Sequence, residues 1–245
     1  MRPSVEPTGF TVRRLKDSQA MSRAAAKLIE TELSEKPDLL FCASAGATPT
    51  GTYENLALRH SLNPGQFGKL RVLQVDEWGG LPEGHPASCR SDLQTKLIRA
   101  LEIDARRFEG FHSNRNGEKE CSRINRWLAA NGPIDVCLLG LGLNGHIAMN
   151  EPADEFNPQA HVSKLSPTSL SHGMLRDLAK KPSFGLTLGL GDILRSRRIV
   201  LVVSGASKRT VLKQLLKRRV SGGLPASFLW LHPDVTLFCD RDALP

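Results

Sequence analysis

The chain has 245 residues, of which 40% are hydrophobic, 24% charged and 5% aromatic, and its formal net charge is +8. This composition is typical of a soluble globular protein with a sizeable core. The scarcity of aromatic residues and the scattered basic residues argue against a nucleic-acid partner, while a positive field suits a small anionic substrate. Five cysteines without CxxC spacing predict a reducing cytoplasm. The first ten residues lack an apolar signal core, and no apolar run is long enough to span a membrane, so we expect no membrane partner.

Short apolar runs alternate with longer amphipathic stretches, which predicts βαβ units. We expect an α/β fold with a Rossmann-like, mostly parallel sheet flanked by helices, in a single domain over residues 1–245. In chain order the predicted elements are helix 17–35, strand 39–43, helix 50–60, strand 70–75, helix 87–100, helix 118–130, strand 136–140, strand 185–190, strand 199–204, helix 208–217, helix 225–231 and strand 235–239. Segment 157–182 lacks periodicity, so it is predicted to be a lid or an irregular helical excursion.

In such sheets ligands bind beyond the carboxyl ends of the strands. The first loop at such an end is SAGATPTGTY, residues 44–53. Its small residues Ala45, Gly46 and Ala47 let the backbone approach a ligand, and Thr48 precedes a predicted helix whose free N–H groups would bind a phosphate. A tight strand-to-helix turn without a ligand would show the same residues. The loop is not a Walker loop, since the GK[ST] ending is missing.

The second loop, VLQVDEWGGLPEGHP, carries Asp76 and Glu77 directly after an apolar strand. A carboxylate in this position suits a general base, because partial burial tunes its pKa. The alternative is a solvated carboxylate that caps a helix or turn. A paired Asp-Glu also suggests a divalent metal, but no third acidic ligand follows another strand, so we predict no metal site.

The third loop, LGLGLNGHIAMNEP, carries His146 and Glu151, a pair suited to acid/base chemistry. The alternative is a structural histidine, with Asn144 in a left-handed turn. Lys208 in SGASK follows another strand and would meet a phosphate, or else is an exposed lysine. Together these loops predict proton transfer on a phosphorylated small molecule. No nucleophile elbow occurs.

Six stretches resemble one known superfamily, that of the glucosamine-6-phosphate deaminases and 6-phosphogluconolactonases. They are GATPTGTY, VDEWGGLP, LGLGLNGHIAMNEP, LTLGLGDIL, VSGASK and PASFLWLHPDVTLFCD, in family order over about residues 37–240. The resemblance implies a NagB/RpiA/CoA-transferase-like fold and a reaction that needs no cofactor or metal.

The resemblance also implies roles for single residues. Asp76 would move a proton between C1 and C2 of the sugar, and His146, assisted by Glu151, would open the sugar ring. Gly46, Ala47, Thr48 and Lys208 would hold the phosphate. The family places one more basic side chain from the segment after NEP on the phosphate, for which His172 and Arg176 are both candidates.

One residue departs from the family pattern. Glucosamine-type enzymes carry an Asp before the GH pair, where this chain has Asn144. An amide orients an imidazole but does not stabilise an imidazolium as a carboxylate does. With this Asn, the chain looks closer to the galactosamine-6-phosphate deaminase/isomerase branch, whose products are tagatose 6-phosphate and ammonia.

Three other functions stay open at this point. They are a glucosamine-6-phosphate deaminase that yields fructose 6-phosphate and ammonia, a 6-phosphogluconolactonase, and a non-catalytic sugar-phosphate sensor. Family hexamers under allosteric control carry a longer C-terminal region than this chain, which favours a monomer or small homo-oligomer.

Overall fold

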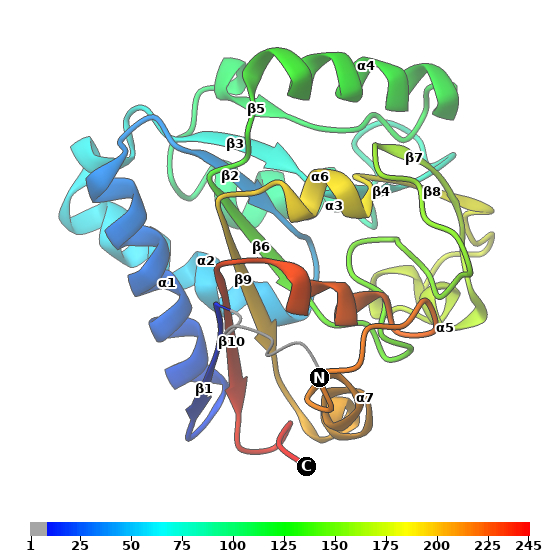
Figure 1. The fold of residues 1–245 in the computed structure, drawn as a ribbon. Coiled ribbons are helices and arrows are strands. Elements are labelled where there is room, and N and C mark those ends of the chain that lie inside the picture. The colour runs from blue at the N-terminus through cyan, green and yellow to red at the C-terminus, as the bar shows by residue number, and fades with distance from the viewer. Residues whose placement is uncertain (1–8) are drawn as a thin grey trace.

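The short apolar runs form the parallel sheet that their pattern predicts (Figure 1). The computed structural model describes residues 9–245. Seven strands lie in the order β1-β10-β9-β6-β2-β3-β5, and all neighbouring pairs are parallel. These strands are β1 (Phe10–Leu15), β2 (Leu40–Ala43), β3 (Arg71–Gln74), β5 (Phe108–Glu109), β6 (Val136–Gly140), β9 (Arg198–Val203) and β10 (Val235–Asp240). The predicted fold class is therefore confirmed.

Helices cover both faces of this sheet (Figure 1). The α-helices are α1 (Ser18–Glu35), α2 (Ala47–Leu62), α3 (Cys89–Leu93), α4 (Gly117–Asn131), α5 (Pro167–Leu170), α6 (Leu190–Leu194) and α7 (Arg209–Leu215). Shorter 3₁₀ segments cover 64–67, 105–107, 173–175, 206–208 and 225–231, and residues 94–98 form a π-helical turn. None of the helices within residues 9–245 is long and apolar enough to cross a membrane.

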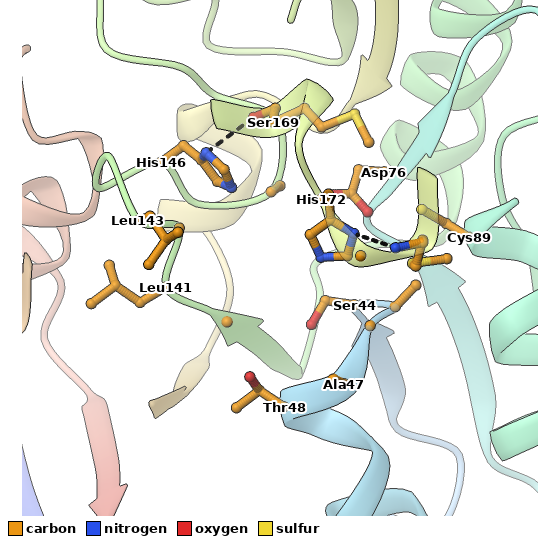
Figure 2. Close-up of a pocket in the computed structure, with 18 of the residues that line it drawn as sticks. Ser44, Ala47, Thr48, Asp76, Cys89, Leu141, Leu143, His146, Ser169 and His172 are labelled. Atoms are coloured by element: carbon orange, nitrogen blue, oxygen red, sulfur yellow. Dashed lines mark hydrogen bonds between the residues drawn. The ribbon is translucent and has the colours of Figure 1, made fainter. Parts of the chain in front are cut away.

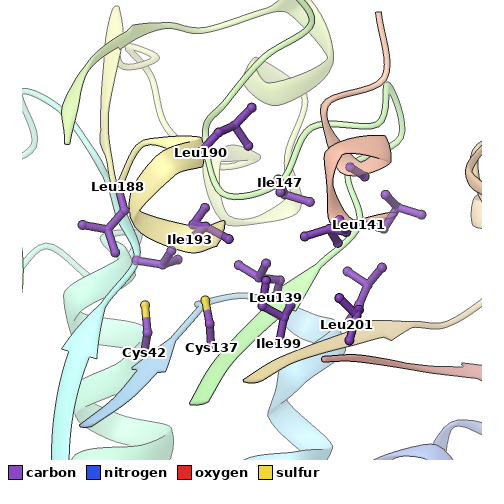
Figure 3. Close-up of a cluster of buried hydrophobic side chains, with 14 of the residues drawn as sticks. Cys42, Cys137, Leu139, Leu141, Ile147, Leu188, Leu190, Ile193, Ile199 and Leu201 are labelled. Atoms are coloured by element: carbon purple, nitrogen blue, oxygen red, sulfur yellow. The ribbon is translucent and has the colours of Figure 1, made fainter. Parts of the chain in front are cut away.

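Successive side chains of each strand enter opposite halves of the core. Phe41 and Leu138 pack with the residues of α1 and α2. Cys42 and Cys137 point the other way and pack with Ile193 of α6 (Figure 3). Because both faces of a parallel sheet are buried, its strands are continuously apolar and do not alternate with polar residues. This is why the central strands could be found from short apolar runs alone.

A second sheet was not expected. It has three antiparallel strands in the order β4-β8-β7, namely β4 (Asp76–Trp78), β7 (His161–Lys164) and β8 (Phe184–Thr187). The prediction that residues 185–190 form a strand of the parallel sheet was wrong. The strand belongs to the small sheet and ends at Thr187, and α6 begins at Leu190. The Asp192 carboxylate accepts a hydrogen bond from the Gly189 N–H and so caps this helix.

Other differences are local. The edge strands β1 and β5 were missed, because the β1 sequence FTVRRL lacks a continuous apolar run and β5 has only two residues. Helix α2 begins at Ala47, three residues before the predicted start, since Gly46 turns the chain with a φ of 113° and Pro49 is tolerated in the first turn. The predicted helix 87–100 is divided into α3 and the π-helical turn, and the predicted helix 225–231 is 3₁₀.

The topology brings the four chemically interesting loops to one edge of the sheet. Residues that follow β2, β3, β6 and β9 leave neighbouring parallel strands at their carboxyl ends. The segment predicted as a lid, 157–182, contains β7, α5 and the 3₁₀ turn 173–175. Part of it, residues 168–174, forms a wall above the same edge. The fold thus supplies one place where all predicted site residues could meet.

Candidate active site

A cavity of about 260 Å³ lies at this edge (Figure 2). Most of the predicted site residues line it, and these are Ala45, Gly46, Ala47, Thr48, Asp76, His146, His172 and Lys208. Three predicted residues do not line it, and these are Asn144, Glu151 and Arg176. The cavity therefore joins the three loops, SGASK and part of the segment 157–182, as the position of the strand ends predicts.

One end of the cavity is suited to an anion. Gly46 turns the chain so that the first residues of α2, Ala47 and Thr48, face the cavity at the positive end of the helix. Lys208 reaches the same space, and its Nζ donates a hydrogen bond to the Leu141 carbonyl at 2.5 Å. Desolvation lowers the pKa of Lys208. The Gly46 N–H is already used, because it donates to Asp92 Oδ2 at 3.0 Å.

His172 completes this wall of the cavity. Its imidazole lies near Gly46 and 5.7 Å from the ring centroid of Trp78. Desolvation, followed by the positive charges of His146 and Lys208, lowers the pKa of His172. Arg176 is exposed and does not line the cavity. Of the two basic residues considered after NEP, only His172 is positioned to face a ligand bound here.

Asp76 enters the cavity from β4. Alternation along this strand puts Asp76 and Trp78 on the cavity side and Glu77 on the other side. Glu77 is fully buried, and its carboxylate accepts hydrogen bonds from the backbone N–H groups of Trp78, Cys89 and Arg90 at 2.7–2.9 Å. Glu77 therefore ties β4 to the first turn of α3 and holds its neighbour Asp76 in place.

The carboxyl group of Asp76 is poised to exchange a proton near neutral pH. Burial, and secondly the negative charge of Glu77, raise the pKa of Asp76 from 3.8 to about 7. Both effects disfavour the ionised form. A carboxyl group with this pKa can accept a proton from one carbon and return it to the next.

His146 faces Asp76 and His172 across the cavity (Figure 2). Its ring packs directly against Gly142, where a Cβ atom would lie only 2.4 Å from the ring. The turn that carries it is closed by a hydrogen bond from the Gly142 N–H to the His146 carbonyl at 2.9 Å. The absence of a side chain at Gly142 therefore leaves the space that the His146 imidazole occupies.

Glu151 lies behind His146, and Asn144 lies beside Glu151. Glu151 Oε2 is 3.5 Å from His146 Nδ1 and accepts a hydrogen bond from Asn144 Nδ2 at 2.8 Å. Ser169 Oγ donates to the other carboxylate oxygen, Oε1. Burial raises the pKa of Glu151, but hydrogen bonds from His146, Ser169 and Asn144 outweigh it and lower this pKa to about 2. Glu151 and Asn144 can therefore act only through His146.

Several lining residues were missed by the sequence analysis, among them Trp78, Thr168 and Ser169. The position of Trp78, two residues after Asp76 on one strand, would have been a usable signal. The stretch SPTS at 166–169 has the pattern of a helix N-cap, which the structure shows at Ser166. Within residues 9–245 no group of three or more His, Cys, Asp or Glu side chains could hold a metal ion.

Comparison with known proteins assigns the family. Residues 16–237 match the family described as glucosamine-6-phosphate isomerases/6-phosphogluconolactonase. The chain therefore belongs to this family.

Individual relatives agree with this assignment. AgaI of Escherichia coli (strain K12), which is named as a deaminase, is 34% identical over 222 residues, 91% of this chain and 88% of AgaI. Glucosamine-6-phosphate deaminase 1 of Bacillus subtilis (strain 168) is 34% identical over 230 residues, 92% of this chain and 94% of that protein. The structure of a monomeric glucosamine-6-phosphate deaminase superposes with a TM-score of 0.91 at 32% identity and covers 95% of this chain and 98% of that chain.

Proposed function

We propose that the protein is an amino-sugar-6-phosphate deaminase that converts galactosamine 6-phosphate into tagatose 6-phosphate and ammonia. One observation carries the reaction type: Asp76, with a pKa of about 7, shares a cavity with His146 and with a helix N-terminus and lysine suited to a phosphate. Similarity to named deaminases over nine-tenths of the chain supports the same reaction.

The phosphate is the first group to be held. It would dock at the N–H groups of Ala47 and Thr48, with Lys208 and His172 as cationic or hydrogen-bonding neighbours. A phosphate bound there would also offset the desolvation of the Lys208 ammonium. This anchoring places the sugar ring between the two proton-handling residues.

His146 would then open the ring. Its Nδ1 faces Glu151 and Ser169, so the other ring nitrogen, Nε2, is the one available to the sugar. It takes the anomeric hydroxyl proton and delivers it to the ring oxygen. The product is the open-chain amino aldehyde.

Asp76 would carry the isomerisation. Its carboxylate removes the proton from C2 as the C1 carbonyl oxygen gains one, which gives an enolamine. It then returns a proton to C1 as the amine loses one and becomes the C2 imine. Water adds to the resulting C2 imine, and ammonia leaves as the C2 ketone forms. The substrate's own carbonyl and amine hold the electrons in every step, so a positioned carboxylate with a suitable pKa is sufficient.

The choice of galactosamine over glucosamine depends on fewer observations. Asn144 stands where glucosamine-type enzymes have Asp, and together with the DEW stretch it resembles the galactosamine branch. The two substrates differ only in the configuration at C4. Glucosamine 6-phosphate, with fructose 6-phosphate as product, is the alternative substrate for the same machinery.

The test is ammonia release by the purified protein from the two amino-sugar phosphates in parallel, without added metal or cofactor. We expect release from both, with a higher kcat/KM for galactosamine 6-phosphate. A variant of an exposed carboxylate, Asp154→Asn, serves as the control for unspecific loss. A higher kcat/KM for glucosamine 6-phosphate would overturn the substrate assignment only. No ammonia from either, together with hydrolysis of 6-phosphogluconolactone, would make the protein a lactonase, and inertness toward all three compounds would favour a sensor.

A further inference from the structure

The hydroxyl of Ser169 occupies an unassigned position between the two members of the histidine–carboxylate pair. Ser169 is 3% exposed, lies on the short helix α5 and follows His146 by 23 residues in the chain. Its Oγ donates to Glu151 Oε1 and lies 3.3 Å from His146 Nδ1. The direct approach of His146 Nδ1 to Glu151 Oε2 is longer, at 3.5 Å. Ser169 is therefore the nearer partner of the ring.

The direction of each hydrogen bond in this group can be derived. Glu151 has a pKa of about 2, so near neutral pH it is ionised and only accepts hydrogen bonds. A serine hydroxyl has one proton, and Ser169 gives it to Glu151. Toward His146 the Ser169 oxygen can only accept. Both neighbours of His146 Nδ1 are thus acceptors, and the proton of the neutral ring must sit on Nδ1.

We propose that Ser169 is a positioning residue that holds the His146 imidazole as the Nδ1–H tautomer and leaves Nε2 as the base that opens the sugar ring. The last part of this statement rests on the function proposed above, whereas the tautomer is a property of the free protein. Ring opening needs an unprotonated nitrogen directed at the sugar. The other ring nitrogen of His146, Nε2, points to the side of the cavity where Asp76 and His172 lie (Figure 2).

Asn144 fits the same scheme. Its Nδ2 donates to Glu151 Oε2 at 2.8 Å and to Ser166 Oγ at 3.2 Å, and its Oδ1 accepts from the His146 backbone N–H at 3.3 Å. Every polar atom of the amide is used to place Glu151 and the His146 turn. The charge that polarises the imidazole comes from Glu151, and Ser169 connects that charge to the ring.

The experiment combines a spectrum with kinetics. Long-range ¹H–¹⁵N spectra of the histidine rings at alkaline pH report which nitrogen is protonated, and His146→Gln identifies the His146 signals. We expect the wild type to show Nδ1–H. Ser169→Ala leaves Nδ1 only the longer contact with Glu151, so it should show an increased Nε2–H population and a kcat lowered about ten- to a hundredfold, the effect of one hydrogen bond to a charged unit. KM should change little, because Ser169 acts through His146. Ser169→Thr keeps the hydroxyl and should restore both readouts.

The control is Ser61→Ala, which removes a serine hydroxyl that donates only to the Leu58 carbonyl at 2.8 Å on α2. An Nε2–H ring in the wild type would overturn the proposal without any variant. Wild-type signals and wild-type kcat in Ser169→Ala would do the same. If Ser169→Ala does not fold, the wild-type spectrum and the spectrum and kcat of Ser169→Thr test whether a hydroxyl at position 169 goes with the Nδ1–H tautomer. A wild type that releases no ammonia would refute the deaminase function. The spectrum would still show which nitrogen of His146 is protonated.

Discussion

Two carboxyl groups on opposite sides of His146 differ in almost every respect. Asp76 lies in the cavity wall with a negative neighbour, and its pKa is raised to about 7. Glu151 lies outside the cavity, where hydrogen bonds from His146, Ser169 and Asn144 lower its pKa to about 2. The first group can exchange a proton near neutral pH. The second keeps a permanent charge that orients the imidazole.

The comparison shows how the same functional group, a carboxyl, serves two purposes. Burial alone disfavours the charged form of both groups, and hydrogen-bond donors decide the outcome. Glu151 receives several donors and stays ionised, whereas the pKa of Asp76 is governed by burial and by Glu77. When the environments of two titratable groups move their pKa values apart, one group can act as an acid or base and the other can stay charged. Substitutions of single residues can test these two roles.

The largest effect is expected for Asp76→Asn. The amide cannot take the C2 proton, so kcat should fall about 10²–10⁴-fold while substrate still binds. Measurement of kcat by ammonia release, and of binding by calorimetry, checks both parts. Asp154→Asn should match the wild type. Unchanged turnover in Asp76→Asn would remove Asp76 from the reaction.

Gly142→Ala tests whether the position of the His146 ring in the cavity matters for turnover. A Cβ atom at position 142 would lie 2.4 Å from the His146 ring, so the ring must move. A displacement on the order of 1 Å can cost about a hundredfold in rate, and we expect a loss of that size in kcat. Gly65→Ala is the matched control, because its nearest atom would be 3.9 Å away. A kcat within twofold of wild type would contradict the packing described for His146.

Asn144→Asp restores the residue that the glucosamine-type pattern has. In this structure it would put a carboxylate oxygen in place of the Nδ2 that donates to Glu151 at 2.8 Å. Two carboxylates so close cannot both stay ionised. We expect roughly a tenfold lower kcat at neutral pH, since a hydrogen bond is replaced by repulsion, and a smaller loss at lower pH. A kcat equal to or above wild type would show that Glu151 does not depend on the amide.

The smallest effect concerns stability. The folded-state pKa of Asp76 is raised from 3.8 to about 7, so the ionised group destabilises the fold increasingly as the pH rises through this window. Asp76→Asn removes the penalty, and its gain in Tm over wild type should grow between pH 4 and pH 7. Each kcal/mol removed corresponds to about 2–4 °C for a chain of this size. A gain that is independent of pH would contradict the raised pKa.

Apolar runs in the sequence predicted five of the seven strands of the parallel sheet and the loops that carry chemistry, but they did not predict the edge strands β1 and β5. Strands β2, β6 and β9 are buried on both faces, so their apolar runs identify them without long-range information. Since parallel strands end at one edge, Asp76, His146 and Lys208 were predicted to meet, and the cavity brings them together.

The division of side chains between the cavity wall and the residues behind it depended on the tertiary fold. It placed Glu151 behind His146, brought Ser169 to both, and left Arg176 outside the cavity. It also assigned β8 to the small sheet that carries Asp76. These outcomes depend on loop conformations and on packing between segments far apart in the chain. A local pattern reports burial and period, but it does not report which distant group each side chain will meet.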